Sequence, residues 1–400
     1  MSAHADTSNL QPGKHSVSNR VRTMYSVFIF IGVTTFVIGL LRAPERIWPS
    51  YLTSYFYFVS LALGGLFFSA IQYVTRAGWS VNVRRMSESM TSFLPWAAVG
   101  AVVLLFGARE LYIWLDHDIV SKDHVLEHKA AYLNLKFFIV RLIAFIALWL
   151  FFVKKIIGNS LQQDHSGASS LTLKNVKYGV AFILTFALSY SLFSVDLLMS
   201  VQPHWFSTIF GVYCFAGLFQ SSLAMICLLT IYLMKKGHLK GFVNGNHLHD
   251  LGKFLKAFTV FMAYIGFSQF MLIWYANIPE ETEFFLHRAH GGWMAISLSL
   301  LFFKFIVPFL WLLPQQSKRN PDRLAIGAVL ILVMQYVDIY WLVYPNFNDN
   351  HVAFGVYEVG VFLGILGVFL MGVHRFLEKN SLVPMNDPYR HESMHHHVVF

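Results

Sequence analysis

Charged residues are scarce in this chain of 400 residues, with Asp, Glu, Lys and Arg making up 13% of it. Soluble domains carry roughly 25%. Apolar residues make up 56%, and the mean hydropathy is +0.54. A soluble globule of this length could not cover its surface with so few charges. The composition excludes a disordered chain, a fibrous repeat and a secreted disulfide scaffold, and it predicts a polytopic membrane protein.

Cysteine is nearly absent. The two cysteines, Cys214 and Cys227, lie in one apolar run, where a helix would hold them roughly 20 Å apart, too far for a disulfide. No CxxC or CxxCH pattern occurs, which excludes iron–sulfur ligation and covalent haem c in this chain. No histidine lies in the middle of an apolar run, so an embedded haem b is not expected. We therefore expect no cofactor and no metal bound by this chain.

Apolar runs long enough to cross a bilayer, about 20 residues each, occur ten times. Backbone polar groups must be paired inside hydrocarbon, so runs this continuous are helices rather than barrel strands. The expected fold class is all-α, with ten transmembrane helices in residues 25–374. The spans are Tyr25–Leu41, Tyr51–Val74, Phe93–Leu115, Leu133–Val153, Val176–Met199, Phe206–Leu233, Phe254–Tyr275, Gly291–Leu313, Leu324–Val343 and Val352–His374.

Lysine and arginine alternate in density from loop to loop. If the N-terminus is cytoplasmic, 21 of the 30 Lys and Arg residues fall on the cytoplasmic side and 5 on the other. This bias is the signature of membrane topology, and no nucleic-acid partner is expected from the net charge of +9. Residues 1–24 and 375–400 are then cytoplasmic tails.

Eight charged residues fall inside the expected spans, where ionisable groups are costly and are functional candidates. They are Arg109, Glu110, Lys136, Arg141, Asp196, Lys304, Asp338 and Glu358. All but Lys304 lie toward the outer side, and no acidic residue is expected between Lys304 and the cytoplasm. The four acids and Lys304 are candidates for proton transfer, with the three other cations as their charge partners. Structural ion pairs are the alternative.

Several polar motifs leave two interpretations open. Asp196 and His204 either flank a quinone head group or belong to a structural turn. The acidic outer loops at residues 116–128 and 280–283 are either a docking face or solvated loops.

Two histidine motifs and three glycines in the tenth span have structural interpretations. The sequence Asn244–Asp250 is typical of a helix cap, which we favour over a metal site. His395–His397 could hold a metal only with ligands from elsewhere. Three glycines in the tenth span, Gly360, Gly364 and Gly367, indicate close helix packing.

Four sequence segments carry a family resemblance: Ser194–Tyr213, Gly78–Ser80, Tyr132–Arg141, and Asn246–Lys253 continuing to Gln269–Glu281. They resemble the ActF-type membrane subunits of bacterial alternative complex III, a quinol:electron-acceptor oxidoreductase. Such subunits are similar to the polysulfide-reductase (NrfD-like) membrane family. The resemblance extends from about Ile71 to the tenth span.

This resemblance implies two four-helix bundles, from spans 2–5 (residues 51–199) and spans 6–9 (residues 206–343). It also implies a place in the bacterial inner membrane, within a complex that oxidises quinol or menaquinol. Haem c and iron–sulfur clusters would belong to partners. These partners are a related NrfD-like quinol-site subunit, a periplasmic iron–sulfur subunit and multihaem cytochrome c subunits, with a terminal oxidase as a further candidate.

The expected function is that of an integral subunit that scaffolds a quinol-oxidising complex and conducts protons, without activity of its own. A secondary transporter is one alternative. Transporters have matched broken helices, whereas Pro308 is the only proline in the middle of an expected span. A purely structural membrane anchor is the other alternative.

Overall fold

The computed structural model describes residue 13, residues 15–348 and residues 351–397, and no strand occurs among them. Ten helical segments are long and apolar enough to cross a membrane, which confirms the predicted all-α, ten-span fold. Spans one to seven and nine are α1 (Asn19–Arg42), α2 (Pro44–Val74), α3 (Val81–Met90) with α4 (Leu94–Phe106), α8 (Leu135–Ser166), α9 (Ser170–Leu197), α10 (Phe210–Lys235), α11 (Gly245–Ala276) and α16 (Pro321–Val343). The eighth span runs through α13 (Trp293–Ser299), η5 (Leu300–Ile306) and α14 (Val307–Trp311), and the tenth is α17 (Val356–Lys379).

Several helices extend beyond their apolar runs. The first span has 24 residues, and the fourth and fifth continue almost to each other. Gly167 ends α8 with φ +66°, a left-handed conformation that glycine adopts without steric cost. Consequently, lysines expected in the loop between these spans lie on helices instead.

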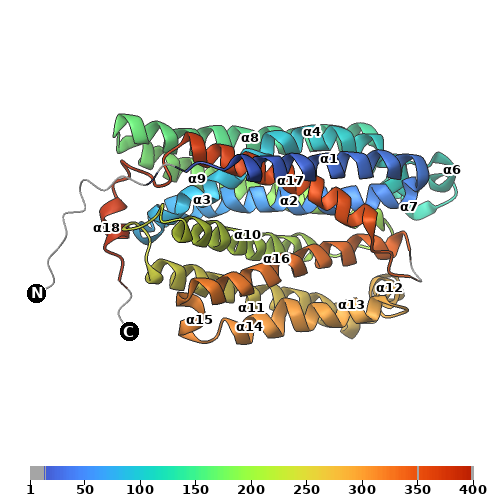
Figure 1. The fold of residues 1–400 in the computed structure, drawn as a ribbon. Coiled ribbons are helices and arrows are strands. Elements are labelled where there is room, and N and C mark those ends of the chain that lie inside the picture. The colour runs from blue at the N-terminus through green and yellow to red at the C-terminus, as the bar shows by residue number, and fades with distance from the viewer. Residues whose placement is uncertain (1–12, 14, 349–350, 398–400) are drawn as a thin grey trace, which may run out of the picture.

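The two expected four-helix bundles are present (Figure 1). In the first, α2, α3 with α4, α8 and α9 pack together; in the second, α10, α11, the α13–α14 segment and α16 do so. Helices α2 and α10 contact each other across the bundle interface and are almost entirely buried. Helices α1 and α17 pack together on the flank of α2.

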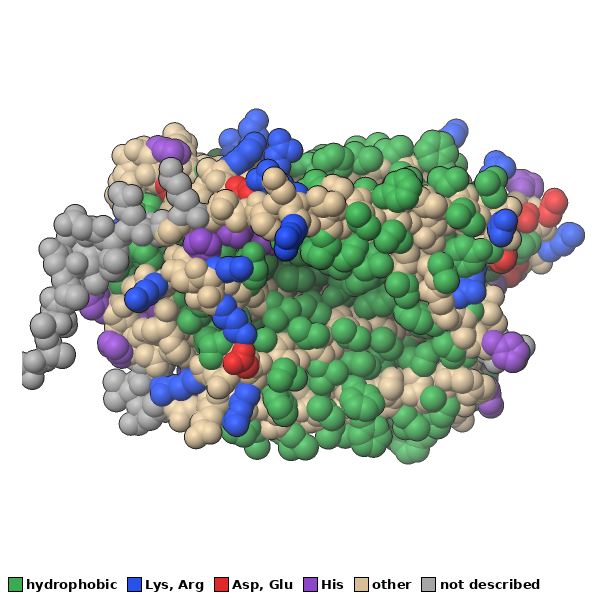
Figure 2. All heavy atoms as spheres, in the orientation of Figure 1, with side chains coloured by type: hydrophobic (Ala, Val, Ile, Leu, Met, Phe, Trp, Pro, Cys, Tyr) green, Lys and Arg blue, Asp and Glu red, His purple; other side chains and the backbone are tan. Residues whose placement is uncertain are grey.

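Because the number of spans is even, the start of α1 and the end of α17 lie at the same end of the molecule (Figure 1). We call this the terminal end and the opposite one the distal end. Figure 2 shows apolar side chains covering the middle of one face and charged side chains toward both ends. This distribution is what a membrane-spanning protein requires.

The residues after α17 do not form a free tail. Leu382 and Val383 are fully buried, and the short helix α18 (Arg390–Met394) contacts α3. The sequence offered no sign of this docking, because residues 380–397 are polar and lack a long apolar run.

The glycines of α17 face α1 closely. A Cβ atom on Gly364 would lie 2.7 Å from the Cα of Gly32, and one on Gly367 would lie 2.8 Å from the carbonyl oxygen of Tyr25. Gly360 similarly abuts Thr35. The prediction that these glycines serve packing is confirmed, because only a hydrogen atom fits between the two helices.

We predict that Gly364→Ala destabilises the protein by about 1–3 kcal/mol, because its methyl group would push α17 away from α1. The matched control is Gly158→Ala in α8, where an added Cβ meets no atom within 4 Å. That change should be neutral or slightly stabilising. Thermal unfolding in detergent measures both, and equal midpoints would contradict the packing account.

Candidate functional site

The first buried ion pair joins the two helices that end the first bundle. The guanidinium of Arg141 on α8 contacts Asp196 on α9 through two hydrogen bonds of 2.7 and 3.1 Å. The Tyr132 hydroxyl donates to the same carboxylate at 2.9 Å, and its ring lies 3.9 Å below the guanidinium carbon. The carboxylate therefore has three hydrogen bonds to charged or polar donors, which is how a buried charge is tolerated.

The second pair lies in the second bundle, where Lys304 on η5 contacts Asp338 on α16 at 2.7 Å. The hydroxyl of Tyr213 on α10 donates to the other carboxylate oxygen. Both charged side chains are buried, with 5% and 2% exposed. Lys304 belongs to a π-helical turn shortly before Pro308. Such turns occur frequently at functional sites.

The third pair connects α17 to α2 at the distal end. Arg46 contacts both carboxylate oxygens of Glu358 at 2.8 Å. Tyr344 donates a hydrogen bond of 2.7 Å, and the backbone N–H of Gly355 donates one of 2.6 Å. Glu358 is fully buried, while Arg46 is half-buried. Arg46 precedes the second expected span, Tyr51–Val74, and so was not among the eight candidates.

Three of the eight candidates are not buried in the membrane domain. Arg109 and Glu110 are exposed on the short helix α5 (Ala108–Leu111), after the third span has ended at Phe106. Their predicted place inside that span is wrong, because the helix breaks at Gly107. Lys136 is exposed on the first turn of α8. None of these three forms an ion pair with another described residue.

Asp196 and His204 do not face a shared space. His204 is exposed and contacts Asp123 at 2.6 Å, whereas Asp196 is held by Arg141 and Tyr132. The hydrogen bond from His204 lowers the pKa of Asp123. Nearby, burial lowers the pKa of Lys129, whose ammonium donates to the carbonyl of Pro203 at 2.6 Å. These contacts tie the turn to the outer loop, as a structural turn requires.

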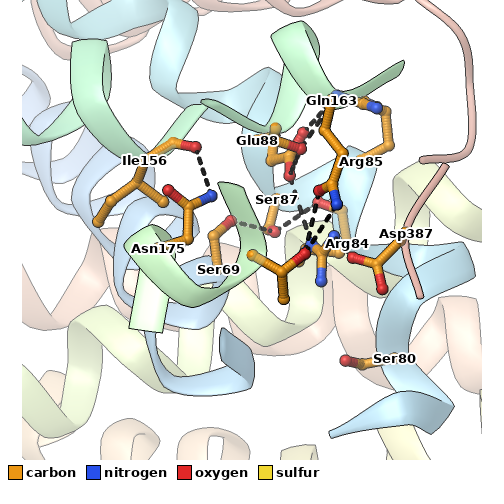
Figure 3. A network of polar contacts seen from close by, with 12 residues as sticks. Ser69, Ser80, Arg84, Arg85, Ser87, Glu88, Ile156, Gln163, Asn175 and Asp387 are labelled. Atoms are coloured by element: carbon orange, nitrogen blue, oxygen red, sulfur yellow. Dashed lines mark hydrogen bonds and ion pairs between the residues drawn. The ribbon is translucent and has the colours of Figure 1, made fainter. Parts of the chain in front are cut away.

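A fourth, larger charge cluster lies at the terminal end (Figure 3). On α3, Arg85 contacts Glu88 at 2.6 Å, and it also contacts Asp164 on α8 at 2.5 Å. Arg84 contacts Glu88 at 3.4 Å and Asp387 at 2.6 Å. Glu88 and Arg85 have no exposed surface. We call these five residues the terminal cluster.

The terminal cluster was not expected, because Arg84, Arg85 and Glu88 precede the third expected span, Phe93–Leu115. The expectation that no acidic residue lies between Lys304 and the side of the termini is wrong, since Glu88 lies at the terminal end. The sequence does contain a pattern that predicts these ion pairs. Glu88 follows Arg84 by four residues and Arg85 by three, the spacing of side-chain pairs on one helix, and an apolar run begins shortly afterwards. Reading the third span from Gly78 rather than Phe93 would have placed them inside it.

Polar side chains also occur between the two ends. Near the terminal cluster, Ser87 and Ser69 are hydrogen-bonded at 2.8 Å. In the second bundle, the side-chain amide of Gln220 on α10 donates to the hydroxyl of Thr259 on α11 at 3.1 Å. These groups are buried, and hydroxyls of this kind can both donate and accept a proton in a hydrogen-bonded chain.

The histidine motifs have structural partners. Asn244 caps α11 by accepting hydrogen bonds from the backbone of Asn246 and His247, which confirms the predicted helix cap. His396 contacts Asp250 at 2.6 Å. Among the described residues, no group of three or more His, Cys, Asp or Glu side chains could hold a metal ion.

No protein-family model matches the chain, and no curated protein matches it significantly. The arrangement of its own residues therefore has to carry any functional conclusion.

We predict that Glu88→Gln destabilises the protein by about 3–5 kcal/mol, because the buried guanidinium groups of Arg84 and Arg85 lose their shared carboxylate. Asp322→Asn is the matched control. Asp322 pairs with Lys235 at the same end but is 72% exposed, so its loss should cost at most about 1 kcal/mol. Unfolding in detergent measures both, and a small effect of Glu88→Gln would contradict the buried network.

Proposed function

We propose that this integral membrane protein is a proton-conducting, scaffolding subunit of a quinol-oxidising respiratory complex of the alternative complex III type. The observation that supports it best is the buried contact of Lys304 with Asp338, completed by the Tyr213 hydroxyl. It places two ionisable side chains and a hydroxyl in direct contact inside the second bundle. Such groups within a span are typical of proton relays.

The chemistry of the cations distinguishes Lys304 from Arg141. A lysine ammonium can lose its proton when it is buried, whereas a guanidinium stays protonated. A proton passed to Asp338 would leave Lys304 as a neutral amine beside a neutral acid, with no isolated charge. The same transfer between Arg141 and Asp196 would require a neutral guanidine. We therefore assign proton transfer to the second bundle and a structural role to the pair in the first.

The two bundles use corresponding elements for these pairs. In each, the cation lies on the third helix of the bundle and the aspartate on the fourth, and a tyrosine donates to the aspartate. This correspondence supports a common plan in which one pair can exchange protons and the other holds the helices together.

The proposed role also implies an orientation in the membrane and a set of partner subunits. Its termini would lie in the bacterial cytoplasm, and the distal end would face the periplasmic subunits. Electrons from quinol or menaquinol would pass through haem c and iron–sulfur clusters of those partners, as the resemblance implies. The exposed acidic distal loops supply a hydrophilic face for such subunits. A secondary transporter is the second candidate, favoured only by the π-helical turn and Pro308 in the eighth span.

The partnership is tested by mild-detergent purification of the natively expressed protein with an affinity tag. We expect multihaem cytochrome c and iron–sulfur proteins to elute with it, visible as haem absorbance and identified by mass spectrometry. Elution of the chain without any metalloprotein, together with substrate uptake by proteoliposomes containing it alone, would favour the transporter instead.

The proton role is tested by Lys304→Arg in the intact complex. Because arginine keeps the charge but does not release its proton, we expect quinol-driven proton release to fall by at least about ten-fold. Proton release is followed with a pH indicator dye.

Arg141→Lys is the matched control: it keeps a cation beside Asp196 but loses the two-point contact, so it should weaken the helix pair while changing proton release less than about two-fold. Complex assembly must be unchanged in both variants. Equal proton release in Lys304→Arg and the unaltered complex would leave a scaffolding role alone.

A further inference from the structure

Residues 380–397 cover the terminal end of both bundles. Asp387 is buried and contacts Arg84 of the terminal cluster at 2.6 Å. The backbone N–H of Met385 donates to the Asp164 carboxylate at 2.9 Å, and the Asn386 amide donates to the Asp164 carbonyl at 2.8 Å. Two members of the cluster thus gain partners from the C-terminal segment.

The second half of the segment fits closely against the start of the third span. Ser393 is fully buried and bonds to the carbonyl of Trp79 at 2.8 Å and to the backbone N–H of Asn82 at 3.2 Å. A Cβ atom on Gly78 would overlap the Glu392 carboxylate. Gly78 therefore leaves the space that this segment occupies.

A separate anchor reaches the second bundle. His396 contacts the Asp250 carboxylate on α11 at 2.6 Å, and Lys253 contacts the same carboxylate at 2.6 Å. The segment consequently spans the interface between the two bundles at the terminal end.

The segment has the properties of a movable element. Apart from the five residues of α18, it lacks helix. Leu382 and Val383 anchor its start in the core, whereas residues 385–397 are held mainly by polar contacts. Elements with few apolar contacts open at lower free energy than the helices they cover. The segment contacts the terminal cluster at Arg84 and Asp164, and the fully buried carboxylate of Glu88 is the next member of that cluster, in contact with Arg84.

We propose that residues 380–397 form a lid that controls access of water and ions from the terminal end to the terminal cluster. Its latch is the contact of Asp387 with Arg84, and its second anchor is the contact of His396 with Asp250. The charged or titratable groups that face the latch are Arg85, Glu88, Asp164, Arg390 and Tyr73. This lid is a property of the chain itself, whether or not it belongs to a respiratory complex.

The test is hydrogen–deuterium exchange of the full-length protein in detergent, measured by mass spectrometry. Asp387→Asn removes the charge that pairs with Arg84, so the lid should open more often. We expect exchange in α3 and in residues 380–397 to accelerate together by at least about ten-fold. Exchange in α16, which the segment does not cover, should keep its original rate.

Two comparisons make the outcome decisive. Asp322→Asn, which removes an exposed carboxylate at the same end, should change none of these rates. Deletion of residues 381–400 should give α3 at least the acceleration seen in Asp387→Asn; if that deletion unfolds the chain, Asp387→Asn decides alone. Unchanged exchange in α3 would overturn the lid, and so would a uniform rise in every helix, which indicates general destabilisation.

Discussion

Charges buried within this membrane domain need partners, and the pairs they form determine which helices lie together. Hydrocarbon offers no water to a lone charge, so a buried charge is stabilised by an opposite charge or by several hydrogen bonds, which here often come from another helix. Arg141 and Asp196 join α8 to α9, Lys304 and Asp338 join η5 to α16, and Glu358 brings α17 to Arg46 on α2. Between lipid-like surfaces the hydrophobic effect adds little preference for one neighbour over another, so these polar contacts contribute much of the specificity.

Hydropathy was sufficient to predict the ten spans, because a span is defined by the cost of exposing polar backbone to hydrocarbon. It was not sufficient to predict the terminal cluster. The segment around Arg84 and Glu88 is polar enough to resemble a loop, yet its charges compensate each other inside a large bundle. Hydropathy scores each side chain by itself, whereas the cost of burying a charge depends on partners such as Asp164 and Asp387, which are distant in sequence.

The same reasoning explains the other misplaced candidates. Glu110 follows an apolar run without interruption, and only the break at Gly107 puts it outside the span. Asp196 and His204 are neighbours in sequence, but the turn between them directs one to Arg141 and the other to Asp123. The sequence identifies charged residues inside apolar runs, which need partners. It does not say which partners they have, because the helix packing that brings them together is a property of the whole fold.

The buried groups also limit how a proton could cross the domain. Glu88 lies at the terminal end and Lys304 near the middle, and among the described residues no hydrogen bond links them directly. The serine, threonine and amide groups between them accept and donate hydrogen bonds, but they do not form one continuous chain in this arrangement. Water would have to bridge the gaps, as it does in many polar protein interiors. The proposed lid would limit the entry of such water from the terminal end.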